Sequence, residues 1–314
     1  MFVPRATAVV VIILGLANAA AGAPPVDVYV LSGQSNMYGL ARLRDAHPEN
    51  REPPPRCSMW DGEAFVALNP SSDDRPGEAL FGPELSFCRT MSQLRPGRRH
   101  HLIKFAVPGR GLHHGWLKSK WLPGPPAPGR SNFYPGAHPT DPNVGRHYAE
   151  LRDDIASALA ALEASRIPFE VRGVLWMQGE TDAIKRVTAE GYAVELAHLK
   201  KRLEEDVGRG ALPFVYGQVL PRKPVNPLYL FVREIREAQA RAHWNSGAPE
   251  AIQGAWMVAT DGMPVGKQRL HYTAEGQILL GRAMALAMVQ MQTVLADTST
   301  MDDKRTSKPQ AASR

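Results

Sequence analysis

The sequence predicts an α/β protein: a three-layer, doubly wound sandwich around a five-stranded parallel sheet. Stretches rich in β-branched and aromatic residues alternate with helical patterns along most of the chain. The strand-like stretches also lack a regular alternation of polar and apolar residues, which indicates that helices cover both faces of the sheet. Because strand–helix–strand crossovers are right-handed, this order of elements favours a doubly wound sheet.

The individual elements follow from the same patterns. The expected strands are residues 26–31, 101–107, 171–177, 213–219 and 255–259. The expected helices are residues 83–94, 147–164, 189–206 and 229–244, with a last helix from Thr273 to about Gln292. Residues 108–146 are rich in Pro and Gly and hold several aromatic residues, which predicts a long loop inserted into one domain over residues 24–296. The polar residues 297–314 are expected to form a disordered tail.

The first 23 residues have the pattern of a signal peptide. Arg5 precedes an apolar run over residues 8–16, and small residues with Ala-x-Ala spacing follow it. The run is shorter than the roughly 20 residues of a typical membrane span, although an uncleaved anchor is an alternative. We therefore expect a secreted or periplasmic protein, and no later stretch is expected to span a bilayer.

The composition excludes several classes of protein. The chain has 314 residues, of which 44% are hydrophobic and 22% charged, so it can bury a core. Its net charge of +6 is scattered, without a basic block, which argues against a nucleic-acid partner. Adjacent histidines point in different directions, so the pairs at 100–101 and 113–114 predict no metal site. Gly109-Arg110-Gly111 lacks the Lys-Ser/Thr of a phosphate loop, so we expect no cofactor.

The chain has two cysteines, Cys57 and Cys88. Two cysteines do not make a zinc framework, but an exported chain allows them to form one disulfide bond. The sequence leaves open whether their Cα atoms come within the limit of about 7 Å.

Residues suited to acyl transfer follow several of the predicted strands. Ser35 follows the first strand, Gln178 follows the third, and His271 stands between the last strand and the last helix. Because ligands bind at the carboxyl ends of parallel strands, these side chains are expected to converge. A hydroxyl nucleophile, an imidazole base and hydrogen-bond donors are what acyl transfer needs. Taken alone, Ser35 is a helix cap and His271 a loop residue before the Thr273 cap.

Five motifs in this order resemble a known family. They are GQSNM at 33–37, FGPELSF at 81–87, WMQGETDA at 176–183, VREIREAQ at 232–239 and LHYTAEGQ at 270–277. The set is similar to the sialate O-acetylesterase and acetylxylan esterase group of the SGNH hydrolases, carbohydrate esterase family six. The resemblance covers about residues 26–292 and implies the flavodoxin-like sandwich of SGNH hydrolases.

The resemblance implies roles for the matching residues. Ser35 matches the family nucleophile and His271 the base. The oxyanion hole would consist of the amides of Ser35 and Gly82 and the side chain of Gln178. Without the resemblance, Gly82 is a turn glycine before a helix that starts with Pro83.

The chain departs from the family at Gln268, where most relatives have the aspartate that orients the histidine. We expect a Ser-His dyad in which a main-chain carbonyl near Gln268 accepts the histidine proton. The alternatives are that Asp261 folds back or that Glu180 reaches across from the neighbouring strand. If neither acts in this way, Glu180 and Asp182 are structural, with Glu180 pairing Arg233 or Arg110.

The resulting hypothesis is an exported serine esterase that removes O-acetyl groups from a carbohydrate. Gln34, Asn36, Arg110 and Trp116 are expected to contact the substrate, with Trp121 and Tyr134 also candidates for stacking on a sugar. One alternative is a non-catalytic carbohydrate-binding protein on an esterase scaffold, and another is a lipid or thioester hydrolase. The sugar and the oligomeric state remain open.

Overall fold

A seven-stranded sheet forms the centre of the molecule. The computed structural model describes residues 24–69, 71–72, 78–208 and 210–306, so the predicted signal peptide lies outside the described residues. The strand order is β12-β11-β10-β1-β7-β3-β4, and all neighbours are parallel except β3 and β4. The strands are β1 (Val26–Gly33), β3 (Cys57–Trp60), β4 (Phe65–Ala67), β7 (His100–Ala106), β10 (Phe169–Met177), β11 (Phe214–Gly217) and β12 (Ala255–Val258).

All five expected strands are present, but the prediction of a five-stranded sheet is wrong. The two additional strands are β3 and β4, at one edge of the sheet. They are only four and three residues long, and β4 is mostly exposed. Strands this short have no apolar run of their own, and their conformation depends on pairing with β7, which a local pattern does not reveal.

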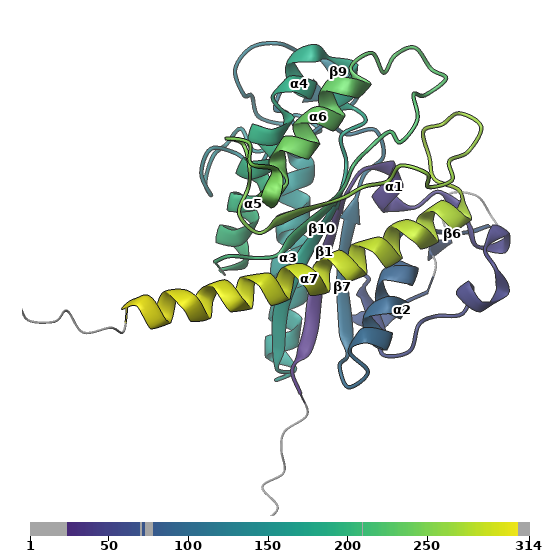
Figure 1. Cartoon of the computed structure of the whole chain (residues 1–314), viewed down its shortest axis with the longest axis vertical. Helices are drawn as coiled ribbons and strands as arrows, with labels where there is room; N and C mark the ends of the chain where they lie inside the picture. The colour runs from purple at the N-terminus through teal and green to yellow at the C-terminus, as the bar shows by residue number, and fades with distance from the viewer. Residues whose placement is uncertain (1–23, 70, 73–77, 209, 307–314) are drawn as a thin grey trace, which may run out of the picture.

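Helices cover both faces of the sheet, which confirms the predicted fold class. The helices are α1 (Ser35–Tyr38), α2 (Glu84–Leu94), α3 (Arg146–Ala164), α4 (Arg186–Glu190), α5 (Tyr192–Val207), α6 (Val232–Ala242) and α7 (Ala274–Thr306). Figure 1 shows α7 and α2 in front of the sheet and α3 behind it.

The structure also contains shorter strands and 3₁₀ helices. Strands β2 (Ala41–Arg42), β5 (Ser71–Ser72) and β6 (Ala79–Phe81) form a separate sheet, and β8 (Trp116–Leu117) pairs with β9 (Lys120–Trp121) inside the predicted 108–146 loop. The short 3₁₀ helices are Leu43–Asp45, Pro48–Asn50, Asp182–Ile184 and Trp244–Ser246.

The last helix is longer than the sequence predicts. It continues past Gln292 and through the first part of the expected tail to Thr306, and residues 307–314 lie outside the described residues. The chain has no Gly or Pro between Gly281 and Pro309, so nothing in this stretch stops the helix.

The same helix corrects the expectation that no later stretch has the character of a membrane span. Its segment Ala274–Asp297 is long and apolar enough to cross a membrane by length and composition alone. In the fold, Leu280, Met284 and Met288 on this segment are fully buried within the core. The buried side of this helix packs on the sheet and on α2, and 39% of the apolar segment is buried.

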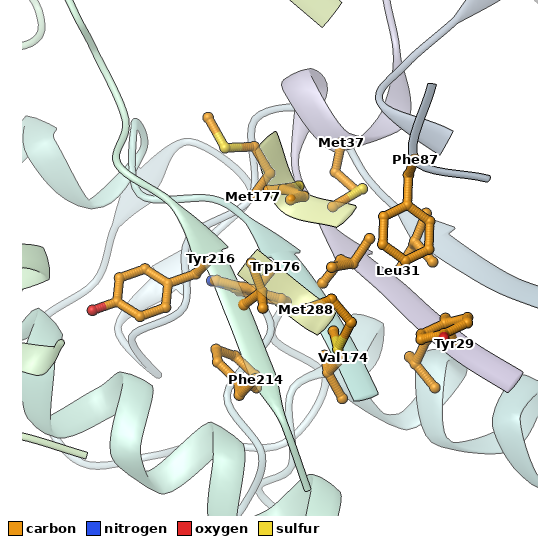
Figure 2. Packing of buried hydrophobic residues seen from close by; sticks show 14 of the residues in the cluster. Tyr29, Leu31, Met37, Phe87, Val174, Trp176, Met177, Phe214, Tyr216 and Met288 are labelled. Carbon is orange, nitrogen blue, oxygen red and sulfur yellow. The ribbon is translucent and has the colours of Figure 1, made fainter. Parts of the chain in front are cut away.

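The core lies on both sides of β1, the central strand. All eight residues of β1 are buried. Figure 2 shows Tyr29 and Leu31 of this strand beside Phe87 of α2, and the rings of Tyr29 and Phe87 meet edge to face with centroids 5.1 Å apart. This packing fixes the position of β1, and with it the turn that leaves its carboxyl end.

Cys57 of β3 and Cys88 of α2 form a disulfide bond, with their Cα atoms 6.2 Å apart. The bond therefore joins the edge of the sheet to one of its covering helices. It closes a loop between residues 31 positions apart in the sequence.

Replacing both cysteines by alanine should lower the free energy of unfolding by about 3–4 kcal/mol, because the unfolded chain regains the entropy of the open loop. The measurement is the urea midpoint of the oxidised protein and of the Cys57→Ala/Cys88→Ala variant. Reduction should shift the midpoint of the natural protein and leave that of the variant unchanged. Equal midpoints for the oxidised protein and the variant would contradict the prediction.

Candidate active site

The predicted nucleophile lies at the carboxyl end of the central strand, which is the upper end of β1 in Figure 1. Gly33 ends β1 with φ +143°, and a Cβ atom there would come within 2.1 Å of the Met177 carbonyl oxygen. The Gln34 amide donates a hydrogen bond of 2.9 Å to that carbonyl. A glycine is therefore required where the chain turns closely past the end of β10. The next residues form α1, and Ser35 is its first residue.

Ser35 and His271 meet across 236 positions of sequence. The Nε2 atom of His271 is 3.1 Å from the Oγ atom of Ser35, which is hydrogen-bonding distance. His271 lies in the loop between β12 and α7. Burial lowers the pKa of the His271 imidazole from its ordinary value of 6.5. The neutral imidazole, which accepts a proton, is therefore favoured at neutral pH.

The third member of a triad is missing in the part of the chain that the structure describes. No hydrogen bond joins the Nδ1 atom of His271 to another described residue. Among the main-chain carbonyls near Gln268, where the acceptor was expected, that of Gln268 receives the Val225 amide at 3.2 Å. Asp261 does not fold back onto His271, because its Oδ1 atom accepts a hydrogen bond of 2.7 Å from Arg236.

Glu180 does not reach His271 either, and it pairs with neither Arg233 nor Arg110. Its Oε1 atom accepts a hydrogen bond of 2.6 Å from the Nδ2 atom of Asn36. Glu180 is completely buried, and this burial raises the pKa of its carboxyl group to about 7. Arg110 donates instead to His147 and to carbonyls of its own turn. The predicted pairing with an arginine is therefore wrong.

Asn36 has a structural position rather than the predicted contact with substrate. Its side chain is buried, with 1% of the residue exposed. Its Nδ2 atom also donates to the Leu270 carbonyl at 3.1 Å, and its Oδ1 atom accepts the Tyr272 amide at 3.1 Å. Every hydrogen-bonding atom of the amide group therefore has a partner within the protein.

Gly82 does not offer its amide to an oxyanion in this structure. The Gly82 amide donates a hydrogen bond of 2.8 Å to the Oε1 atom of Glu84, whose other oxygen accepts one from Lys104. A Cβ atom at Gly82 would lie 2.8 Å from the Met37 carbonyl oxygen. The glycine thus permits close packing against α1, and the oxyanion role predicted for it does not fit its hydrogen bonds.

The side chain of Gln178 is also fully engaged. Gln178 is completely buried, and its Nε2 atom lies at hydrogen-bonding distance from Asp182 Oδ2, Gln34 Oε1 and the Arg110 carbonyl, at 2.7, 3.2 and 3.1 Å. These contacts leave no N–H of Gln178 for an oxyanion. They hold the turn after β7 beside Gln34, the residue that precedes Ser35.

Two backbone amides, unlike the Gly82 amide and the Gln178 side chain, are not engaged in hydrogen bonds to described residues. Neither the Ser35 amide nor the Gly109 amide donates a hydrogen bond to any residue that the structure describes. Gly109 lies in the turn after β7, which Gln178 ties to Gln34. The sequence predicts no role for the glycines of this turn, because nothing local distinguishes a free amide from a bonded one.

Most of the aromatic residues that were expected to contact a sugar are buried. Trp116 is completely buried, and its Nε1 atom donates a hydrogen bond of 2.8 Å to Asp182. Asp182 also accepts the Leu112 amide at 2.8 Å, so it anchors the 108–146 loop to the end of β10. Tyr134 is buried as well, and half-buried Trp121 packs edge to face on Trp116. The prediction of a substrate contact for Trp116 is therefore wrong.

A cleft of about 610 Å³, with polar and apolar residues in its lining, opens beside His271. The charged residues Arg42, Asp45 and Glu275 are part of its lining. The full lining is Leu40, Ala41, Arg42, Asp45, Pro264, Gly266, His271, Tyr272, Thr273, Ala274 and Glu275. No sequence motif identifies these residues, because the cleft forms only where the segment after α1 meets the loop before α7.

Within the described residues, no group of three or more His, Cys, Asp or Glu side chains is placed to hold a metal ion. The rings of His113 and His114 lie with centroids 4.1 Å apart. The Nδ1 atom of His113 accepts the Gly115 amide at 2.9 Å, so this nitrogen serves the local turn.

Comparison with known proteins places the chain in a class of carbohydrate esterases. A family model described as carbohydrate esterase, sialic acid-specific acetylesterase, matches residues 25–290. The chain therefore belongs to this family, which confirms the resemblance seen in the sequence motifs.

Similar individual proteins agree with this placement. A protein of Arabidopsis thaliana named as a probable carbohydrate esterase is 24% identical over 282 residues, covering 84% of this chain and 90% of that protein. The X-ray structure of an Arabidopsis thaliana protein shares the fold with a TM-score of 0.62 at 19% identity, over 85% of this chain and 99% of that one. The crystal structure of NanS shares it with a TM-score of 0.55 at 14% identity, over 85% and 98%.

A third structure has the same fold within a longer chain. It is a carbohydrate acetylesterase of Xanthomonas citri, with a TM-score of 0.51 at 16% identity, and the match covers 85% of this chain and 56% of that one.

Proposed function

We propose that this protein is an exported serine esterase that removes O-acetyl groups from a carbohydrate. The observation that carries the proposal is the 3.1 Å contact between Ser35 Oγ and His271 Nε2, beside a cleft, in a chain that belongs to a carbohydrate esterase family. A hydroxyl paired with a neutral imidazole is the arrangement that activates a serine for attack on an ester.

The reaction has two halves. In the first, Ser35 Oγ attacks the acetyl carbonyl carbon while His271 Nε2 takes the hydroxyl proton, and a tetrahedral oxyanion forms. The carbon–oxygen bond to the sugar then breaks, and the sugar oxygen leaves with the proton from His271. In the second half, His271 takes a proton from water, which attacks the acetyl group on Ser35. The proton on His271 returns to Ser35, and acetic acid leaves and ionises to acetate in solution.

Backbone amides supply the stabilisation of the oxyanion in this proposal. The amides of Ser35 and Gly109 have no acceptor among the described residues, whereas those of Gly82 and the Gln178 side chain are engaged. A donor in an oxyanion hole is typically worth about 100- to 1000-fold in rate. The hydrogen bonds of Gln178 to Gln34 and to the Arg110 carbonyl hold the two amides in the same region.

The character of the cleft supports a sugar rather than a lipid as the substrate. Arg42, Asp45 and Glu275 bring charge of both signs to the wall beside His271, where Arg42 Nε donates a hydrogen bond of 2.9 Å to Asp45. Hydroxyl groups of a sugar can exchange hydrogen bonds with such side chains, whereas a long acyl chain would desolvate them without compensation. Relatives named as carbohydrate esterases point to the same substrate class.

Export is supported by the signal-like pattern of residues 1–23 and by the Cys57–Cys88 disulfide, because disulfides persist mainly in oxidising compartments. Fractionation of cells that express the full chain tests this part. The protein is expected outside the cytoplasm without its first 23 residues or so. Recovery of the full-length chain from the cytoplasm would contradict it.

Release of acetate from different esters tests the activity. We expect the purified protein to deacetylate acetylxylan or O-acetylated sialic acid and to leave long-chain lipid esters and acyl thioesters essentially intact. Both sugar substrates are compared under the same conditions, because the sequence motifs resemble enzymes of either kind. Faster turnover of a long-chain ester than of either sugar ester would overturn the proposed substrate class.

The lowered pKa of His271 predicts activity in mildly acidic solution. The base is active when neutral, so kcat/KM rises with pH through the pKa of His271 in the free enzyme. Because burial lowers this pKa from 6.5, the acid limb should have its midpoint below pH 6.5 and the activity should be nearly level from pH 7 to 8. A profile of kcat/KM on a small acetyl ester between pH 4 and 8 checks this. A midpoint above 6.5 would mean that a negative charge stabilises the imidazolium.

A further inference from the structure

The loop that carries His271 is closed largely by its own hydrogen bonds. Within it the Gly266 amide donates to the His271 carbonyl at 2.8 Å, and the Thr273 amide donates to the Pro264 carbonyl at 3.1 Å. Arg269 adopts a left-handed conformation, with φ +55°, which is uncommon for a residue other than glycine. These features define the shape of the loop, and the Val225 amide holds its Gln268 end at 3.2 Å, but none of these contacts reaches the segment of Ser35.

Asn36 joins this loop to the segment that carries Ser35. Its side chain donates to the Leu270 carbonyl and accepts the Tyr272 amide, so it holds the main chain on both sides of His271. In addition, its own carbonyl accepts a hydrogen bond of 3.1 Å from Gln277 of α7. Because Asn36 follows Ser35 directly, it links the segment that bears the hydroxyl to the main chain on both sides of the imidazole.

Glu180 fixes the orientation of the Asn36 amide group. The Oε1 atom of Glu180, 2.6 Å from Asn36 Nδ2, accepts a hydrogen bond from it either as a carboxylate oxygen or as the carbonyl oxygen of a neutral carboxyl group, and so keeps the NH₂ end of the amide on that side. The Oδ1 end then faces the Tyr272 amide. Burying a carboxyl group costs free energy, and the Oε2 atom of Glu180 has no hydrogen-bond partner among the described residues. A buried carboxyl group with a single partner is costly for stability alone.

We propose that Glu180 and Asn36 are a positioning pair that holds the main chain on both sides of His271, and so keeps the imidazole against Ser35 without a carboxylate on Nδ1. The inference rests on the proposed function. It differs from a triad because Glu180 acts on the backbone of the loop, through Asn36, and does not contact the histidine. It accounts for the burial of both side chains beside a site that lacks the aspartate at Gln268.

The test compares variants on a small acetyl ester. Asn36→Ala and Glu180→Leu should each lower kcat by about 100-fold, the usual cost of a displacement of about 1 Å, and change KM little. Glu180→Gln keeps an oxygen that accepts from Asn36, so it should stay within about 10-fold of the natural protein. Loss of activity in Glu180→Gln equal to that in Glu180→Leu would overturn the acceptor role.

Asn132→Ala is the matched control for loss of stability. Asn132 is buried like Asn36, and its side chain likewise donates to two carbonyls, of His114 and Trp116, and accepts one amide, of Tyr134. If positioning explains the effect, Asn132→Ala should lower Tm about as much as Asn36→Ala and keep kcat within about 3-fold. Equal losses of kcat in the two variants would overturn the inference.

Two further variants separate this inference from the proposed function. In a His271→Ala background, Asn36→Ala should change the residual kcat by less than about 3-fold, because a residue that acts through His271 has nothing left to position. A further 100-fold loss would overturn the pair. Ser35→Ala is measured in parallel. If it is inactive while Asn36→Ala is fully active, the inference about the positioning pair is wrong and the proposed function stands. If Ser35→Ala is fully active, the proposed function fails.

Discussion

Replacing Ser35 by alanine is expected to lower kcat on an acetyl ester by about 10⁴- to 10⁶-fold while the fold is retained. The hydroxyl is the only group in the proposed reaction that bonds to the acetyl carbon, so its loss leaves water as the sole nucleophile. The methyl group of alanine fits the space of the serine, which is buried to all but 4%. Acetate release at high enzyme concentration measures the residual rate.

Ser32→Ala is the matched control for this variant. Ser32 lies three residues earlier on β1, is completely buried, and its Oγ atom has no hydrogen-bond partner among the described residues. Its replacement by alanine should leave kcat within about 2-fold. A Ser35→Ala protein that keeps more than about a tenth of the natural activity would contradict the assignment of the nucleophile.

Replacing His271 by alanine should lower kcat nearly as far as Ser35→Ala. Without the imidazole the serine proton has no acceptor, since no carboxylate of the described residues lies within hydrogen-bonding distance of Ser35 Oγ. Groups that act as a unit are not additive, so the Ser35→Ala/His271→Ala protein should be no slower than either single variant. Independent, multiplied losses in the double variant would contradict a shared step. Urea denaturation of all three proteins checks that each is folded.

The sequence predicted the central part of the fold because that part depends on local patterns. β1 and β10 are long apolar runs, and their identification required no knowledge of their neighbours. The short edge strands β3 and β4 were missed because pairing with β7 determines them. The end of α7 differs from the prediction for another reason. The polar residues 297–306 predict disorder, but they contain no residue that breaks a helix.

The meeting of Ser35 and His271 could be predicted because the carboxyl ends of parallel strands share one edge of the sheet. The contacts of their neighbours could not, because each depends on a partner distant in sequence. Trp116 donates a hydrogen bond to Asp182, 66 residues away in the sequence. Asn36 donates one to Glu180, 144 residues away. A motif identifies such polar residues, but only the fold decides whether they face the substrate or each other.

Covalent labelling with a serine-directed organophosphonate tests the central claim most directly, because only a serine activated by a base reacts at a useful rate. Mass spectrometry of the natural protein should find one adduct per chain, on the peptide that contains Ser35. The His271→Ala variant, treated in the same way, should remain unlabelled. An unlabelled natural protein, or an adduct on any other residue, would contradict the account of Ser35 and His271 as an esterase site.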